Sequence, residues 1–565
     1  MRVALVPGPG KSGVLASLAD DGTPLSPPVE VPDLAAAVAR READDPVRWV
    51  WDCGGRVYPT LLRAGVRVAR CHDAALVDGL LTARDGPASR PGTLTAASAR
   101  RAGLAAPGDP VPSGVREIAS QLLFEEPPAA SAHELLAELI TVHKDQLGRI
   151  GADPLASGFG LLATAESAGG LAAAEMTAAG LPWRADVHDE LLTELLGPRP
   201  AAAPGMPLRP ARLAELTAQI SAALGAVRPV NPDSPAQLLR ALAASGIRVP
   251  STRVSVLRAV DHPVIPLLLR YKELARLHTA NGWSWLDTWV AGGRFRPEYV
   301  VGGVVSGRWA TRGGGALQIP RVLRCAVVAD PGWTLVVADA AQLEPRVLAA
   351  LAGDRAFAQT AAGGDVYAAV ASAVGADRDR AKVALLSAMY GGTGGDGGQS
   401  LALLRRRFPQ ASAFVEAAAR AGEEGRVVRS VLGRTCPPPS AAWLSVTSES
   451  GDPELERDPE AGRASRARGR FTRNFVVQAS AADWALVLLA GLRARLAALD
   501  VDGQRPELVF FQHDEVIVHC PAGLAAEVVT AVEAAAASAT NLVFGATEVS
   551  FPMTTAVVTA YSDAK

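Results

Sequence analysis

The chain has 565 residues, of which 49% are hydrophobic and 20% are charged, and its formal net charge is −2. This length predicts two to four domains, and the near-neutral charge does not exclude a nucleic-acid partner, because basic residues can gather locally. The most apolar stretch, Ala479–Leu499, is interrupted by Asp483, Arg493 and Arg495, and the five cysteines lack CxxC spacing, so we expect no membrane span, zinc site or disulfide.

The first 80 residues predict a small α/β unit. The apolar runs MRVALVP, GVLASLA and WVWDC predict strands, whereas PTLLRAGV and DAALVDGLLTAR have helical spacing. Residues 81–115 and 201–210 are rich in loop-forming or small residues and predict connections. Helical patterns occupy most of residues 128–196 and 211–290.

Beyond residue 290, three β-rich runs lie far apart: YVVGGVVSGRW, TLVVADA and ELVFFQHDEVIVHC. A long helical insertion separates the second run from the third, which indicates an α+β plan with an inserted helical lobe. Asp339 ends the second run, and His513 and Asp514 lie at the tip of a predicted hairpin. Each acid alone is typical of a helix cap or a turn, but the two together form the pair of carboxylates that two-metal phosphoryl transfer requires.

Within the inserted lobe, the segment RDRAKVALLSAMYGG has a four-residue repeat. Arg378, Lys382, Leu386 and Tyr390 therefore share one helical stripe. Two cations, an apolar side chain and an aromatic ring suit a surface that grips a triphosphate and stacks on a base. An ordinary amphipathic helix with its polar face in water is an equal alternative at this point.

From about residue 160 onward, the motifs resemble those of family A DNA polymerases, the Klenow-type large portion of bacterial DNA polymerase I. The pattern D-x-x-Q-x-E-x-R is matched by Asp339, Gln342, Glu344 and Arg346. The patterns R-x3-K-x7-Y-G and H-D-E are matched by Arg378, Lys382, Tyr390 and Gly391, and by His513, Asp514 and Glu515. Two further segments, SGRWATR and RFTRNFVVQASAAD, align Arg308, Arg470, Asn474 and Gln478 with family motifs.

The resemblance implies a right-hand polymerase with palm, fingers and thumb, behind an N-terminal RNase H-like α/β domain of the exonuclease type. The expected domains are a degenerate 3′–5′ exonuclease-like domain at 1–155, a thumb with the start of the polymerase at 156–290, palm at 291–352 and 461–565, and fingers at 353–460. Its implied partners are primer-template DNA and dNTPs. A cytoplasmic, nucleoid-associated monomer without membrane contact is expected.

The resemblance also implies roles for single residues. Asp339 and Asp514, with the main-chain carbonyl of Ala340, would hold two Mg²⁺ ions, and Mn²⁺ would be able to substitute. Arg378 and Lys382 would grip the incoming phosphates, and Lys382 would also donate a proton to pyrophosphate. The other expected roles are a steric gate at Glu344, the template-base position at Tyr390, nucleotide contacts from Gln342, Tyr367 and Leu386, DNA contacts from Arg308, Arg470, Asn474, Gln478 and His513, and support of the metal site by Glu515.

The sequence departs from the family pattern in two regions. Leu386 replaces a Phe or Tyr, and the loss of the ring's contact area predicts weaker nucleotide binding. Tyr367 replaces a His and can donate a hydrogen bond to phosphate but cannot become cationic. In the N-terminal domain no D-x-E follows the first strand, Val57 stands at the second acidic position, and Asp73 matches a position that does not bind metal, so no proofreading is predicted. A repair or gap-filling polymerase is expected, while a specialised translesion polymerase and a non-catalytic primer-template binding protein remain open.

Overall fold

The computed structural model describes residues 1–86, 93–104, 130–200, 209–315, 319–391, 402, 404–448, 459–500 and 503–564. These form two compact units. The first contains Met1–Ala179, Glu298–Ala310 and Val336–Ala556, and the second contains Gly180–Pro297, Thr311–Leu335 and Val557–Lys565. The connections predicted at 81–115 and 201–210, and the glycine-rich stretch after Gly391, lie partly or largely outside the described residues.

The N-terminal part of the first unit is a five-stranded sheet with the strand order β3-β2-β1-β4-β5. β1 pairs antiparallel with β2 and parallel with β4, and β4 pairs parallel with β5. The strands and helices are β1 (Arg2–Pro7), β2 (Gly13–Leu18), β3 (Val29–Val31), α1 (Leu34–Asp44), β4 (Arg48–Trp51), α2 (Gly54–Arg63), β5 (Arg70–Asp73), α3 (Ala74–Asp85), α4 (Leu94–Arg101) and α5 (Ala132–Gly151).

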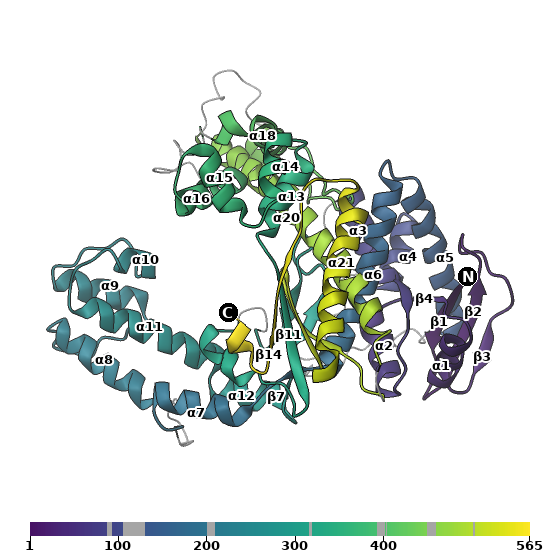
Figure 1. The fold of residues 1–565 in the computed structure, drawn as a ribbon, viewed down its shortest axis with the longest axis horizontal. Coiled ribbons are helices and arrows are strands. Elements are labelled where there is room, and N and C mark those ends of the chain that lie inside the picture. Colours follow the sequence, from purple (N-terminus) through teal and green to yellow (C-terminus); the bar gives the residue numbers. More distant parts are fainter. Residues whose placement is uncertain are drawn as a thin grey trace, which may run out of the picture. The chain divides into compact units, whose positions relative to one another are not determined.

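Both faces of this sheet are covered, as the alternation of side chains along β1 requires. Val3 and Leu5 enter a core with Trp49 and Trp51. Ala4 and Val6 point to the opposite face, into a core to which α4 and α5 contribute. Figure 1 shows α4 and α5 beside the strands. The α/β organisation predicted from the sequence is therefore present.

Helix α6 (Ala156–Ala179) belongs to the first unit, and the second unit starts at Gly180. The physical reason is that α6 is buried on nearly all sides: it packs against α2, β5, β12 and α20. Glu175 on α6 accepts hydrogen bonds from Arg493 on α20, which also donates to the carbonyls of Val68 and Ala69. The N-terminal sheet, α6 and α20 are thus held together.

A second sheet has the order β12-β13-β11-β14. Helix α21 runs along one of its faces (Figure 1). This part consists of β9 (Glu298–Val300), β10 (Ala310–Arg312), β11 (Trp333–Ala340), α13 (Leu343–Leu351), β12 (Glu507–Gln512), β13 (Glu515–Pro521), α21 (Ala525–Phe544) and β14 (Met553–Val558). The strand ending near Asp339 and the hairpin around Asp514 both form as predicted.

Between β11 and β12 lies the predicted helical lobe. Its helices are α14 (Arg355–Ala361), α15 (Val366–Val374), α16 (Arg378–Tyr390), α18 (Pro409–Glu423), α19 (Ala441–Ser448) and α20 (Pro459–Leu496). Three successive helices begin at an aspartate whose carboxylate accepts from main-chain amides: Asp354 for α14, Asp365 for α15 and Asp377 for α16. Such caps fix where each helix starts.

Among the described residues, α20 and Ala522–Phe544 are long and apolar enough to span a membrane by length and composition alone. The most apolar window of α20 is 83% buried inside the fold, and that of Ala522–Phe544 is 39% buried. Such burial of α20 is typical of the central helix of a globular domain.

The second unit is mainly helical and contains a small sheet of order β6-β8-β7. Its elements are β6 (Leu181–Pro182), α7 (Ala185–Leu196), α8 (Ala211–Ala223), α9 (Pro235–Ala244), α10 (Val254–Leu257), α11 (Val264–Asn281), α12 (Trp283–Trp289), β7 (Val290–Ala291), β8 (Arg294–Phe295) and two 3₁₀ helices, Arg321–Ala326 and Tyr561–Ala564. Trp183, Trp285 and Phe295 pack ring against ring in its core.

Candidate active site

The two predicted catalytic acids come together where β11 meets the β12–β13 hairpin. Asp339 is the next-to-last residue of β11, and Asp514 lies in the turn between β12 and β13. The amide of Ala340 donates to the carbonyl of Asp514 over 3.1 Å, which joins the two segments. Burial, and then the negative charge of Asp339, raise the pKa of Asp514 to about 7. The carboxylates therefore lie within each other's field.

This pair of carboxylates suits a hard divalent cation whose remaining ligands come from a substrate. Among the residues that the structure describes, no three His, Cys, Asp or Glu side chains are placed to hold a metal ion. A cation beside Asp339 and Asp514 would relieve their repulsion, and Mg²⁺ characteristically takes one or two carboxylates and completes its shell with water and phosphate oxygens. Glu515 is buried at the start of β13, and its charge is a lesser cause of the raised pKa of Asp514.

Unusual backbone conformations also gather here. Gln342 and His513 are the non-glycine residues with positive φ, at 56° and 58°, within the described chain. Left-handed backbone is disfavoured for such residues and is held in place by surrounding contacts, often at functional sites. For Gln342 those contacts are to the start of α15: its amide group donates to Asp365 over 2.8 Å and accepts from the amide of Val366 over 2.7 Å.

Glu344, the predicted steric gate, lies at the centre of a polar cluster. One of its carboxylate oxygens accepts from Arg308 and the other from the hydroxyl of Tyr390. Burial, and then the bond to Glu344, raise the pKa of Tyr390 to about 12, so the hydroxyl remains a donor. Gln478 also hydrogen-bonds to Tyr390. Arg308, from the segment before β10, and Tyr390, from α16, thus fix the carboxylate of Glu344 on α13.

The four-residue repeat of the sequence forms one face of α16. The Nε of Arg378 donates to Asp365 over 2.8 Å. The cations of Arg378 and Lys382 lie 5.7 Å and 5.8 Å from the centre of the Tyr367 ring, within cation–π range. Leu386 and Tyr390 follow on the same face, where Leu386 lines a pocket.

The pocket has a volume of about 230 Å³ and is open to one side. The predicted site residues that line it are Arg308, Gln342, Glu344, Tyr367, Leu386, His513 and Asp514. Its remaining wall includes residues that the sequence analysis did not single out: Trp309, Phe511, Ala481, Ala482 and Ala485. The only local signal for Trp309 was its position next to Arg308.

The other predicted DNA-contacting residues lie along α20, outside this pocket lining. Arg470, Asn474 and Gln478 are spaced four residues apart and so follow one side of the helix. Arg470 packs against Gly391, where an added Cβ would lie 2.9 Å from the Cγ of Arg470. The Oδ1 atom of Asn474 is buried and has no hydrogen-bond partner in the described part of the chain.

Known proteins resemble this chain over its larger C-terminal part. Residues 209–562 match the protein family described as DNA polymerase family A. A thermostable DNA polymerase I of Thermus filiformis is 28% identical over 303 residues, which cover 47% of this chain and 33% of that protein. DNA polymerase I of Chloroflexus aurantiacus is 27% identical over 296 residues, which cover 46% and 28%. The chain thus matches about a third of the length of these relatives.

The fold has a counterpart among solved structures. The POL domain of Pol1 from M. smegmatis, in complex with DNA primer-template and dNTP, superposes with a TM-score of 0.71 at 18% sequence identity. The match covers 100% of this chain and 95% of that domain, so it includes the N-terminal sheet as well. With the family match over more than half of its residues, the chain belongs to DNA polymerase family A.

Proposed function

We propose that the chain is a DNA-templated DNA polymerase that adds dNTPs to the 3′-hydroxyl of a primer, with Asp339 and Asp514 holding two Mg²⁺ ions. The observation that carries the proposal is that the segments of these two acids meet, since the amide of Ala340, next to Asp339, donates to the carbonyl of Asp514 over 3.1 Å. Burial and the charge of Asp339 also raise the pKa of Asp514 to about 7. The main-chain carbonyl of Ala340 is the further candidate ligand. Such ions, when bound, favour deprotonation of the primer hydroxyl and neutralise charge on the triphosphate.

The face of α16 would bind the triphosphate. Asp365 engages the Nε of Arg378, which orients the guanidinium plane and leaves its terminal amino groups for two phosphate oxygens. Lys382 is exposed beside Tyr367 and would protonate the departing pyrophosphate. Tyr367, Leu386 and Gln342 border the same pocket and would contact the nucleotide.

Glu344 would exclude ribonucleotides. Arg308 and Tyr390 hold its carboxylate in place, so the space that a ribose 2′-hydroxyl needs would stay filled. Together with Arg308 and His513, the side chains along α20 would follow the duplex, where minor-groove acceptors shared by all base pairs report fit without reading sequence.

Proofreading is not expected from the N-terminal domain. Asp73, a buried acid in its sheet, uses one carboxylate oxygen to accept from Gly54 over 2.6 Å and the other to accept from Leu76 over 3.1 Å. These bonds cap α2 and α3, so the carboxylate has a structural role. We therefore propose that the chain does not remove mismatched ends. We also propose that it is a cytoplasmic, nucleoid-associated monomer that fills gaps during DNA repair.

Primer extension tests the proposal directly. With Mg²⁺, the wild type should extend a primer on a longer template, and Asp514→Asn should lower the rate at least about 10³-fold while primer-template binding persists. Asp500→Asn, at an exposed acid beyond α20, is the matched control and should extend normally. A wild type that binds primer-template but does not extend it would refute the proposal and indicate a binding protein. A primer with a mismatched 3′ end should not be shortened in the same assay.

A further inference from the structure

A buried charged cluster lies beneath the segment that carries Arg308. We call Arg434, Glu166 and Asp483 the Arg434 cluster. Arg434 donates from Nε to Asp483 and from Nη2 to Glu166, each over 2.8 Å, and all three side chains are less than 10% exposed. Charges at this depth are held by good geometry, because an unpaired ion there would be costly.

The main chain before Arg308 rests directly on this cluster. A Cβ added at Gly307 would lie 2.4 Å from the Nε of Arg434, and one added at Gly302 would lie 2.5 Å from Glu166. Both glycines have positive φ, +84° and +59°. Glycine is therefore required at both positions for the turn to lie on the Arg434 cluster.

Main-chain hydrogen bonds within the turn connect Gly307 to Arg308. The amide of Gly307 donates to the carbonyl of Val304 over 2.8 Å, and the amide of Val304 donates to the carbonyl of Arg308 over 3.0 Å. The side chain of Arg308 then bonds to Glu344 at the pocket. A shift of the Arg434 guanidinium would thus move Gly307, and with it the main chain of Arg308.

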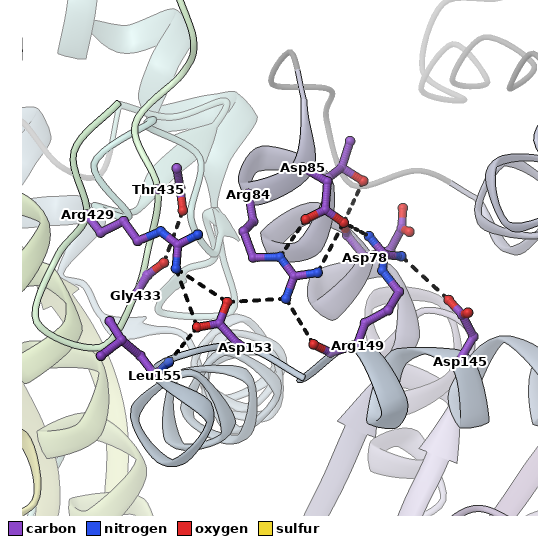
Figure 2. A network of polar contacts seen from close by, with 11 residues as sticks. Asp78, Arg84, Asp85, Asp145, Arg149, Asp153, Leu155, Arg429, Gly433 and Thr435 are labelled. Carbon is purple, nitrogen blue, oxygen red and sulfur yellow. Dashed lines mark hydrogen bonds and ion pairs between the residues drawn. The ribbon is translucent and has the colours of Figure 1, made fainter. Parts of the chain in front are cut away.

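The segment that carries Arg434 is anchored in turn to the N-terminal domain. Arg429 pairs with Thr435 across a tight turn, and the Nη1 of Arg429 lies 3.4 Å from Asp153. The side chain of Asp153 is 1% exposed and also accepts from Arg84 of α3 over 3.3 Å. Figure 2 shows Asp153 between Arg84 and Arg429.

We propose that Arg434 is a positioning residue for Arg308, and that the N-terminal domain supports it through Asp153. The inference rests on the proposed polymerase function, in which Arg308 contacts the primer-template and fixes Glu344. Arg434 itself is buried and is not among the residues that line the pocket. It acts by setting where Gly307, and therefore Arg308, lies.

A double-mutant cycle tests this role. Arg434→Lys keeps the charge but cannot bond both carboxylates in the same plane, and it should lower kcat/KM for dNTP about tenfold per active molecule. In the Arg308→Ala background the same substitution should change kcat/KM less than about twofold. Equal losses in both backgrounds, with active molecules counted by a single-turnover burst, would mean that Arg434 only stabilises the fold, and the inference would be wrong.

A second cycle keeps the test decisive if Arg434→Lys does not fold. Gly307→Ala should reproduce the tenfold loss and should also lose its effect in the Arg308→Ala background. Gly332→Ala is the matched control, because its φ is +81° but nothing lies within 4 Å of an added Cβ. Normal extension by Gly307→Ala would overturn the inference. Failure of the wild type to extend primers would instead refute the proposed function, so the two failures are distinguishable.

Discussion

The ion pair between Asp365 and Arg378 offers a sharp test of how α16 would bind nucleotide. Asp365→Asn keeps an oxygen that can cap α15 and accept from Gln342, but it places an amide donor against the Nε of Arg378. Arg378 then loses its anchor, while the start of the helix is preserved.

The size of the expected change in KM for dNTP follows from the charge and exposure of Asp365 and Arg378. Partial burial raises the pKa of Asp365, but hydrogen bonds led by that of Arg378 outweigh it and hold the pKa at about 2. A fall of about two units in the pKa of Asp365 corresponds to about 2.5 kcal/mol of stabilisation of its charged form by all of its partners together. Because the Asp365 side chain is 38% exposed and that of Arg378 is 50% exposed, solvent screening reduces the share of Arg378 to about 1 kcal/mol. That loss predicts a roughly fivefold rise in KM for dNTP.

Steady-state primer extension at saturating primer-template measures this rise, with kcat expected to change little. Asp377→Asn is the matched control, because Asp377 caps α16 and lies 3.3 Å from the Nε of Arg380, which is 72% exposed. An unchanged KM in Asp365→Asn, or an equal rise in Asp377→Asn, would refute the anchoring role.

Two further outcomes are expected. Leu386→Phe adds ring area to the pocket wall and should lower KM for dNTP about fivefold, and an unchanged KM in steady-state kinetics would contradict the expected contact. His72 and His143 are buried edge to face, and burial lowers their pKa values to about 4 and about 2. The free energy of unfolding is therefore full above pH 6.5, where both rings are neutral in either state. By about pH 5 the unfolded rings are protonated, and each histidine should lower the free energy of unfolding by about 2 kcal/mol. Urea denaturation at about pH 7.5 and about pH 5 measures the loss, and His143→Leu should reduce the difference.

Local patterns were enough to predict the structure of the two segments that carry Asp339 and Asp514. An apolar run that ends in Asp339, and a polar turn between two β-rich runs at Asp514, determine where each acid stands along its own strand. The repeat from Arg378 to Tyr390 likewise predicted a helical face. These features depend on neighbours in sequence, so periodicity captures them.

Contacts between distant segments could not be predicted in this way. The bonds of Arg434 to Glu166 and Asp483 join residues 268 and 49 positions apart, and nothing in the pattern around them indicates burial. Gln342, whose backbone is left-handed, likewise contacts Asp365, which lies 23 positions further along the chain. The packing of α6 was equally out of reach, because this helix has small and apolar residues on nearly every side, which does not indicate which partner covers it.

The hydrogen bonds from Arg493 to the N-terminal sheet bear on attempts to engineer a shorter chain. Deleting residues 1–155 would remove the Val68 and Ala69 carbonyls that accept from this guanidinium and would uncover apolar surface on α6. The N-terminal domain therefore contributes to the packing of α6 and α20 and cannot be removed without loss. Miniaturisation should begin at other segments and leave this one in place.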